Sequence, residues 1–179
     1  MLTEHELISM VFLLIVAGHE TTVNLIGNGM LALLRNSTQL RRLRADPSLV
    51  TGAVEELLRY DGPIETSTFR FSTADVELPS GTIPAGEVVL LVLASANRDH
   101  TRFADADSLD ITRTGNRHLA FGKGMHFCLG AALARMEGQI AIATLLRRLP
   151  HLRPAVRLDT LEWRPSLLIR GLRTFPVLF

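Results

Sequence analysis

The chain has 179 residues, enough for one domain, and 47% of them are hydrophobic, which excludes an intrinsically disordered protein. Lys and Arg number 19 against 18 Asp and Glu, so the charge balance gives no reason to expect nucleic acid or an anionic membrane surface as a partner. Cys128 is the single cysteine, which excludes an internal disulfide and suits a reducing compartment such as the cytoplasm.

The first predicted element is a helix from about Glu4 to Leu34, which begins with a capping box between Thr3 and Glu6. Its apolar run, Ile8 to Gly18, is shorter than the roughly 20 residues that span a bilayer, and its acidic leader is unlike that of a signal peptide. The run is apolar almost all round. We therefore expect a buried helix that is covered on every side, as in the interior of something larger.

Further elements follow from periodicity and turn residues. We expect helices at about 38–44, 48–60 and 129–149, and strands at 66–71, 76–78, 88–93, 152–157 and 163–177. The segment 97–123 has no sustained period, and loops of that length are often functional. The predicted fold class is mainly α with small β-sheets (α+β).

The segment from Phe121 to Gly130 surrounds the cysteine with glycine, aromatic and basic residues. Cys128 precedes a long predicted helix, whose N-terminus offers free N–H groups and partial positive charge to a thiolate. Gly122 and Gly130 allow close backbone approach, and His126 adds positive charge. Two other interpretations stay open: a buried structural cysteine, and a nucleophile that His126 activates.

The spacing Phe-Gly-x-Gly-x-His-x-Cys-x-Gly over this segment closely resembles the haem-ligand signature of the cytochrome P450 family. The resemblance implies haem b, with Cys128 as the iron ligand and His126 paired with a haem propionate. It also implies that Phe121 packs beside the sulfur, and that N–H groups near Gly130 tune the electron donation of the sulfur.

The segment Ala17-Gly-His-Glu-Thr-Thr22 gives the first helix a notch of small residues. Thr21 can return its hydroxyl to the Ala17 carbonyl, which loosens the helix. In the family this notch lies over the distal face of the haem, where Ala17 and Gly18 leave room for dioxygen and Glu20 and Thr21 deliver protons. A zinc-protease motif is excluded, because position 23 is Val and not His.

Two further features, a Glu–Arg pair and a separate arginine, fit the resemblance. Glu56 and Arg59 share one helix face, and in the family such a pair joins a later arginine, here Arg102, in a buried network. The placement of Arg102 departs from the family pattern, because relatives commonly have proline just before this point. Arg70 matches an arginine that many bacterial members place against a haem propionate; the alternative is a cross-strand charge on an exposed face.

The resemblance covers the whole chain and implies that residues 1–179 are the C-terminal portion of a single haem-thiolate monooxygenase domain whose N-terminal half is absent. It implies insertion of one oxygen atom of dioxygen into an organic substrate. Electrons would come from a ferredoxin or flavoprotein and ultimately from NAD(P)H. Likeness to actinomycete enzymes that tailor macrolides suggests a bulky, polyketide-like substrate. The alternative function is a non-catalytic haem-binding or interaction fragment.

Overall fold

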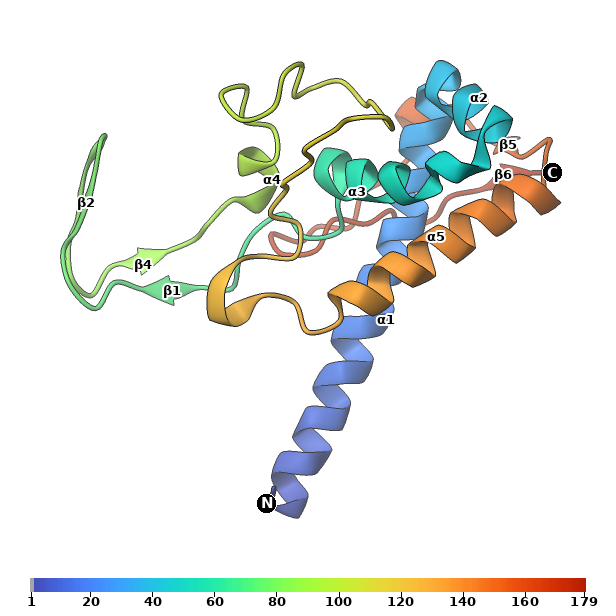
Figure 1. Cartoon of the computed structure of the whole chain (residues 1–179). Coiled ribbons are helices and arrows are strands. Elements are labelled where there is room, and N and C mark those ends of the chain that lie inside the picture. The colour runs from blue at the N-terminus through green and yellow to red at the C-terminus, as the bar shows by residue number, and fades with distance from the viewer. Residues whose placement is uncertain (1) are drawn as a thin grey trace.

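The computed structural model describes residues 2–179 and confirms a mainly helical fold with small sheets (Figure 1). The helices are α1 (Glu4–Arg35), α2 (Ser37–Ala45), α3 (Val50–Asp61), α4 (Leu93–Ala96) and α5 (Ala131–Arg148). The strands are β1 (Arg70–Phe71), β2 (Val76–Leu78), β3 (Gly81–Ile83), β4 (Val88–Val89), β5 (Arg153–Pro154) and β6 (Val177–Leu178). Short 3₁₀ turns are η1 (Pro47–Leu49), η2 (Gly124–His126) and η3 (Leu158–Thr160).

Helix α1 starts at the predicted capping box. The Thr3 N–H donates to Glu6 Oε2 over 2.8 Å, and the Glu6 N–H donates to Thr3 Oγ1 over 3.3 Å. The Thr3 N–H and the Thr3 hydroxyl both donate to Glu6 Oε2, which lowers the pKa of the Glu6 carboxyl. Among the described helices, α1 alone has the length and mean hydropathy of a membrane span, properties that the core helix of a soluble protein shares.

The first half of α1 extends beyond the rest of the protein (Figure 1). The expected burial of its apolar run is therefore wrong within residues 2–179: Phe12 is 68% exposed and Ile15 is 64% exposed. The physical reason is that α3 and α5 pack against the second half of α1, where Asn24 to Leu33 hold the buried positions.

The core lies where the second half of α1 meets α3 and α5. Small residues let these helices approach closely. A Cβ on Gly138 of α5 would lie 3.1 Å from Leu25 Cδ2, and one on Gly29 of α1 would lie 3.1 Å from Leu57 Cδ1. The fully buried apolar side chains of this core include Leu25, Leu31, Leu33, Val54, Leu57 and Ile142.

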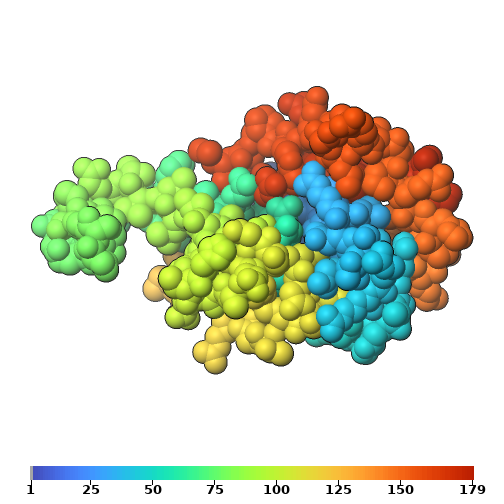
Figure 2. Space-filling view, turned by 90° about the horizontal axis from the view of Figure 1, so that it is seen from above, coloured from blue at the N-terminus to red at the C-terminus, as the bar shows by residue number. Residues whose placement is uncertain are grey.

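The strands form separate two-stranded antiparallel sheets, β1 with β4, β2 with β3, and β5 with β6. The strand predicted at 76–78 is confirmed as β2, whereas the other predicted strands are shorter than expected. Leu93 begins α4 instead of ending a strand. The prediction missed β3, whose Gly81 follows the turn and pairs with Leu78. The β2–β3 hairpin projects from the body (Figures 1 and 2).

The C-terminal segment returns to α1 and α3. Asn28 Nδ2 donates to the Arg170 carbonyl over 2.9 Å, and Arg170 Nε pairs with Asp61 at the end of α3. The Arg170 guanidinium also lies 3.5 Å from the centre of the Trp163 ring. At Gly171 an added Cβ would meet Asn24 Oδ1 at 2.1 Å, so any side chain there would displace the Asn24 amide where this segment crosses α1.

Candidate functional site

Cys128 lies in a tight loop that its own backbone closes. The Cys128 N–H donates to the Phe121 carbonyl over 2.9 Å, and the Phe127 N–H donates to the Gly124 carbonyl over 3.0 Å. Gly122 and Gly124 have φ angles of 71° and 76°, which a side chain would strain. The loop thus has a defined shape, and Cys128 is exposed on it.

The loop brings Cys128 to the start of α5. The Ala131 N–H donates to the Cys128 carbonyl over 3.3 Å, and Gly130 is the N-cap without any side-chain cap. A Cβ at position 130 would lie 3.9 Å from Cys128 Sγ, an ordinary van der Waals distance, so Gly130 borders the sulfur directly. Uncapped N–H groups and the helix dipole stabilise an anion at this end of a helix.

Aromatic rings flank the same loop. The Phe121 and Phe127 rings lie 6.3 Å apart and are tilted by 59°. His126 is exposed in η2, and within residues 2–179 it makes no hydrogen bond to Cys128. The arrangement of a cysteine nucleophile beside an activating histidine is therefore not formed, and the exposure of Cys128 also rules out a buried structural cysteine in the described chain.

The predicted notch in α1 is present. Thr21 Oγ1 donates to the Ala17 carbonyl over 2.5 Å. A Cβ on Gly18 would meet nothing within 4 Å in the described chain, so the helix surface there is open. Glu20 Oε1 pairs with Arg164 Nη1 over 2.8 Å, and both side chains are partly exposed. The Glu20 carboxylate and the Thr21 hydroxyl belong to adjacent residues of α1, and α1 packs directly on α5.

The predicted pair of Glu56 and Arg59 is buried, with exposures of 0% and 1%. Arg59 Nε donates to Glu56 Oε2 over 2.7 Å, and Arg59 Nη2 donates to Oε1 over 2.8 Å. Arg59 also donates to the carbonyls of Asn97, Ala106 and Ser108. The pair therefore fixes the irregular segment between α4 and the cysteine loop onto α3.

The predicted third member of this network is wrong. Arg113, and not Arg102, contacts Glu56, with Nε at 3.1 Å from Oε2. Arg102 is exposed in the turn after Asp99, because its neighbour Phe103 takes the buried position. No local pattern singled out Arg113, because its contact with Glu56 joins residues that are 57 positions apart.

Arg70 lies in β1, paired with Val89, and is half-buried. Among the described residues it forms no ion pair, so its predicted contact with a propionate stays a prediction, as does that of His126.

Sequence reasoning missed a second polar cluster beside the cysteine loop. Glu55 binds Arg135 of α5 through two bonds of 2.7 and 3.0 Å, and His118 Nε2 lies 3.2 Å from Glu55 Oε2. Burial is the largest single influence and would raise the pKa of Glu55, but the contacts with His118 and Arg135 together lower it to about 2. Little in the sequence indicated this cluster, because Glu55, His118 and Arg135 belong to different predicted elements.

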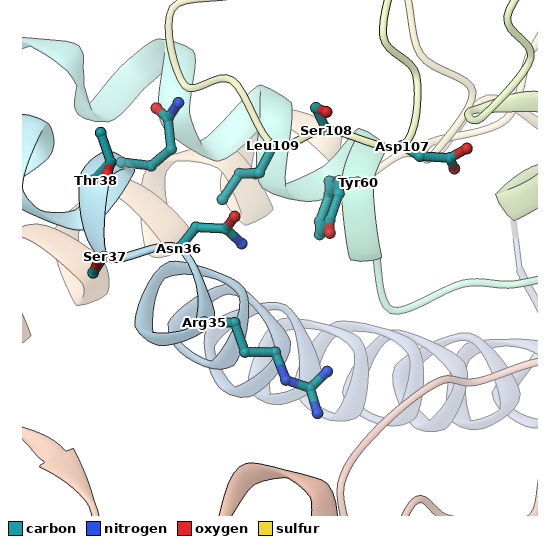
Figure 3. Close-up of a pocket in the computed structure, with 9 residues that line it drawn as sticks. Arg35, Asn36, Ser37, Thr38, Tyr60, Asp107, Ser108 and Leu109 are labelled. Carbon is teal, nitrogen blue, oxygen red and sulfur yellow. The ribbon is translucent and has the colours of Figure 1, made fainter.

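A cavity adjoins the cysteine loop, and another lies apart from it. One, of about 650 Å³, is lined by loop residues including Gly122, Lys123 and Phe127, and by Arg102 and Arg117. The other, of about 450 Å³, lies at the corner between α1 and α2 (Figure 3) and holds none of the predicted site residues. The first cavity adjoins the cysteine loop and is rimmed by cations.

The comparisons with known proteins decide the family. The family model described as cytochrome P450 matches residues 1–170. The chain belongs to the cytochrome P450 family. It is 57% identical to cytochrome P450 107B1 of Saccharopolyspora erythraea and 53% identical to the cytochrome P450 monooxygenase PikC of Streptomyces venezuelae, covering 98% of this chain in each case.

Solved cytochrome P450 structures agree. The tirandamycin C-bound monooxygenase TamI superposes with a TM-score of 0.95 at 55% identity, over 98% of this chain and 44% of that one. The chain likewise spans 44% of P450 107B1 and 42% of PikC, which is less than half of each relative.

Haem held by a cysteine thiolate is the cofactor that membership of this family implies. The donor set fits it. Residues 2–179 contain no cluster of three or more His, Cys, Asp or Glu that could hold a bare metal ion. A lone exposed sulfur suits iron that a macrocycle already ligates, whereas zinc needs three or four protein ligands.

Proposed function

We propose that this P450 chain carries the haem-thiolate site of a monooxygenase that inserts one oxygen atom of dioxygen into an organic substrate. The other oxygen atom leaves as water, and the electrons come from NAD(P)H through a ferredoxin or flavoprotein. One observation carries the proposal: Cys128 stands exposed in a glycine-shaped loop at the start of α5, and α5 packs on the helix that holds the Ala17–Thr21 notch.

The cysteine side would bind and orient the cofactor. Cys128 would be the iron ligand, with Gly122 giving the loop its left-handed turn, Gly130 bordering the sulfur and Phe121 forming an apolar wall. The guanidinium of Arg70 and the His126 ring would bind the propionates. Bound haem supplies the iron at which dioxygen is activated.

The α1 side would move protons. The Thr21 hydroxyl donates its hydrogen bond to the Ala17 carbonyl, so it can donate elsewhere only by leaving that bond. Its lone pairs remain free to accept a hydrogen bond meanwhile. Glu20, one residue earlier, is oriented by Arg164 and would pass protons from solvent, while Ala17 and Gly18 leave space beside the hydroxyl.

For the substrate we propose a bulky, polyketide-like molecule, supported by the names of relatives such as the Bacillus subtilis polyketide biosynthesis P450 PksS, 46% identical. For the electron donor we propose an acidic protein that docks near Lys123, Arg102 and Arg117, the cations around the larger cavity. The protein would act in the cytoplasm, where an unpaired Cys128 stays reduced.

The test is Cys128→Ser in the haem-loaded protein. Serine is rarely ionised and donates little electron density, so we expect the thiolate-type carbon-monoxide difference spectrum to vanish. Lys123→Gln, a substitution in the same loop without a metal-binding atom, should keep the spectrum. An unchanged spectrum in Cys128→Ser would refute the proposal.

The alternative function is a haem-binding or interaction fragment without turnover. The exposure of Phe12 and Ile15 favours it, because this half of α1 leaves the notch side open to water. A thiolate spectrum without any substrate oxidation would select this alternative.

A further inference from the structure

Glu55, His118 and Arg135 connect three elements around Phe121. Glu55 is on α3, Arg135 is on α5, and His118 precedes the cysteine loop. The Arg135 guanidinium lies 4.4 Å from the centre of the Phe121 ring, and the His118 and Phe121 ring centres are 5.9 Å apart. Phe121 is therefore held by a cation and an imidazole that share one carboxylate.

The hydrogen bonds define a single arrangement of this cluster. His118 Nδ1 accepts from the Ala120 N–H over 3.1 Å, so Nε2 carries the proton and donates to Glu55. The His118 side chain is only 3% exposed. Arg135 donates to both carboxylate oxygens of Glu55 in a bidentate pair. This pair fixes the orientation of the guanidinium over the Phe121 ring.

The cluster leads directly to the sulfur. The carbonyl of Phe121 accepts the Cys128 N–H, so a shift of Phe121 moves the backbone of the ligand. The Arg135 guanidinium lies 4.4 Å from the centre of the Phe121 ring, and the backbone of Phe121 is hydrogen-bonded to that of Cys128. The charge of Arg135 is therefore held against the loop that carries the sulfur.

Adjacent acids on α3 consequently serve different segments. Glu56 binds the irregular segment through Arg59 and Arg113, whereas Glu55 faces the cysteine loop through Arg135 and His118. We propose that Glu55, His118 and Arg135 form a positioning network that fixes Phe121 and the Cys128 loop, and that the charges of Glu55 and Arg135 set the electron donation of the thiolate. The second part rests on the proposed haem-thiolate function.

The charges of the network predict opposite effects on the haem. Arg135→Gln leaves Glu55 unneutralised beside the loop, so the added negative field should lower the reduction potential of the iron. Glu55→Gln leaves Arg135 unneutralised and should raise it. A merely structural role would loosen the site in both variants and would not give shifts of opposite sign. The double variant should return near the wild-type potential.

The loop itself is tested without haem. Amide hydrogen exchange at Cys128 reports its bond to the Phe121 carbonyl. Arg135→Gln and Glu55→Gln should both accelerate this exchange by about tenfold or more. Arg147→Gln is the matched control, since Arg147 is exposed on the same helix, and it should change neither the exchange nor the potential.

Exchange at Cys128 that is equal in Arg135→Gln and Arg147→Gln would overturn the network. Potentials that shift in the same direction, or not at all, in Arg135→Gln and Glu55→Gln would overturn its electrostatic part. A wild-type protein that binds no haem would defeat the proposed function instead, and the exchange comparison would still decide the network.

Discussion

Replacement of Glu56 by Ala should destabilise the protein more than any change on its surface. The Glu56 carboxylate accepts hydrogen bonds from Arg59, Arg113, Asn116 Nδ2 and the Asp110 N–H. None of its side chain reaches water. Its loss leaves the Arg59 guanidinium, equally buried, with two donors facing no partner.

The magnitude follows from this burial. Removing one partner of a buried ion pair costs about 3–5 kcal/mol, because the remaining charge is left uncompensated. Total stability is about 5–15 kcal/mol, so this loss is a large fraction of it. For a chain of this size each kcal/mol shifts the melting temperature by about 2–4 °C, which gives a fall of about 6–20 °C.

The assay is thermal unfolding of the wild type, Glu56→Ala and Glu87→Ala, followed by circular dichroism. Glu87 is exposed and its side chain makes no hydrogen bond in the described chain, so its replacement should have little effect. Equal melting temperatures for Glu56→Ala and Glu87→Ala would refute the reasoning, since they would place the carboxylate of Glu56 in water.

Three other outcomes are expected. Thr21→Ala should keep haem binding but divert oxygen to peroxide, measured as product formed per electron-donor equivalent; full coupling would remove Thr21 from the mechanism. Because the pKa of Glu55 falls from 4.5 to about 2 on folding, its stabilising contribution is complete above about pH 4.5 and is lost as the pH falls towards 2; urea midpoints at several pH values should show this loss in the wild type and less of it in Glu55→Gln. Residues 1–179 alone, given haem and an electron donor, should not hydroxylate a substrate; product from the monomeric chain would contradict this.

Features encoded locally could be predicted from the sequence. The capping box of Thr3 and Glu6 marked the start of α1, and the turn at 61–63 marked the end of α3. The cysteine loop was predictable because its glycines occupy backbone angles that few other residues adopt. The pairing of Glu56 with Arg59 is likewise local, since the two residues are three apart on one helix.

Features that depend on tertiary contacts could not be predicted. Arg113 lies 57 residues from Glu56, and Arg135 lies 80 residues from Glu55. No local sequence pattern distinguishes Arg113 and Arg135 from the other arginines of the chain. The strand predicted at 66–71 shrank to Arg70–Phe71 because the ladder with β4 covers only these residues, and Thr66 keeps an isolated bridge to Val92.

The return of the C-terminal segment to α1 has a consequence for synthesis on the ribosome. Asn28 bonds to Arg170, 142 residues later, and Glu20 meets Arg164, 144 residues later. At about 5–20 residues per second, roughly 7–28 s separate the emergence of these partners. Throughout that interval the acid at position 20 and the amide at position 28 lack their partners. The contacts of α1 with the C-terminal segment therefore form late in synthesis, after Cys128 has been added to the chain.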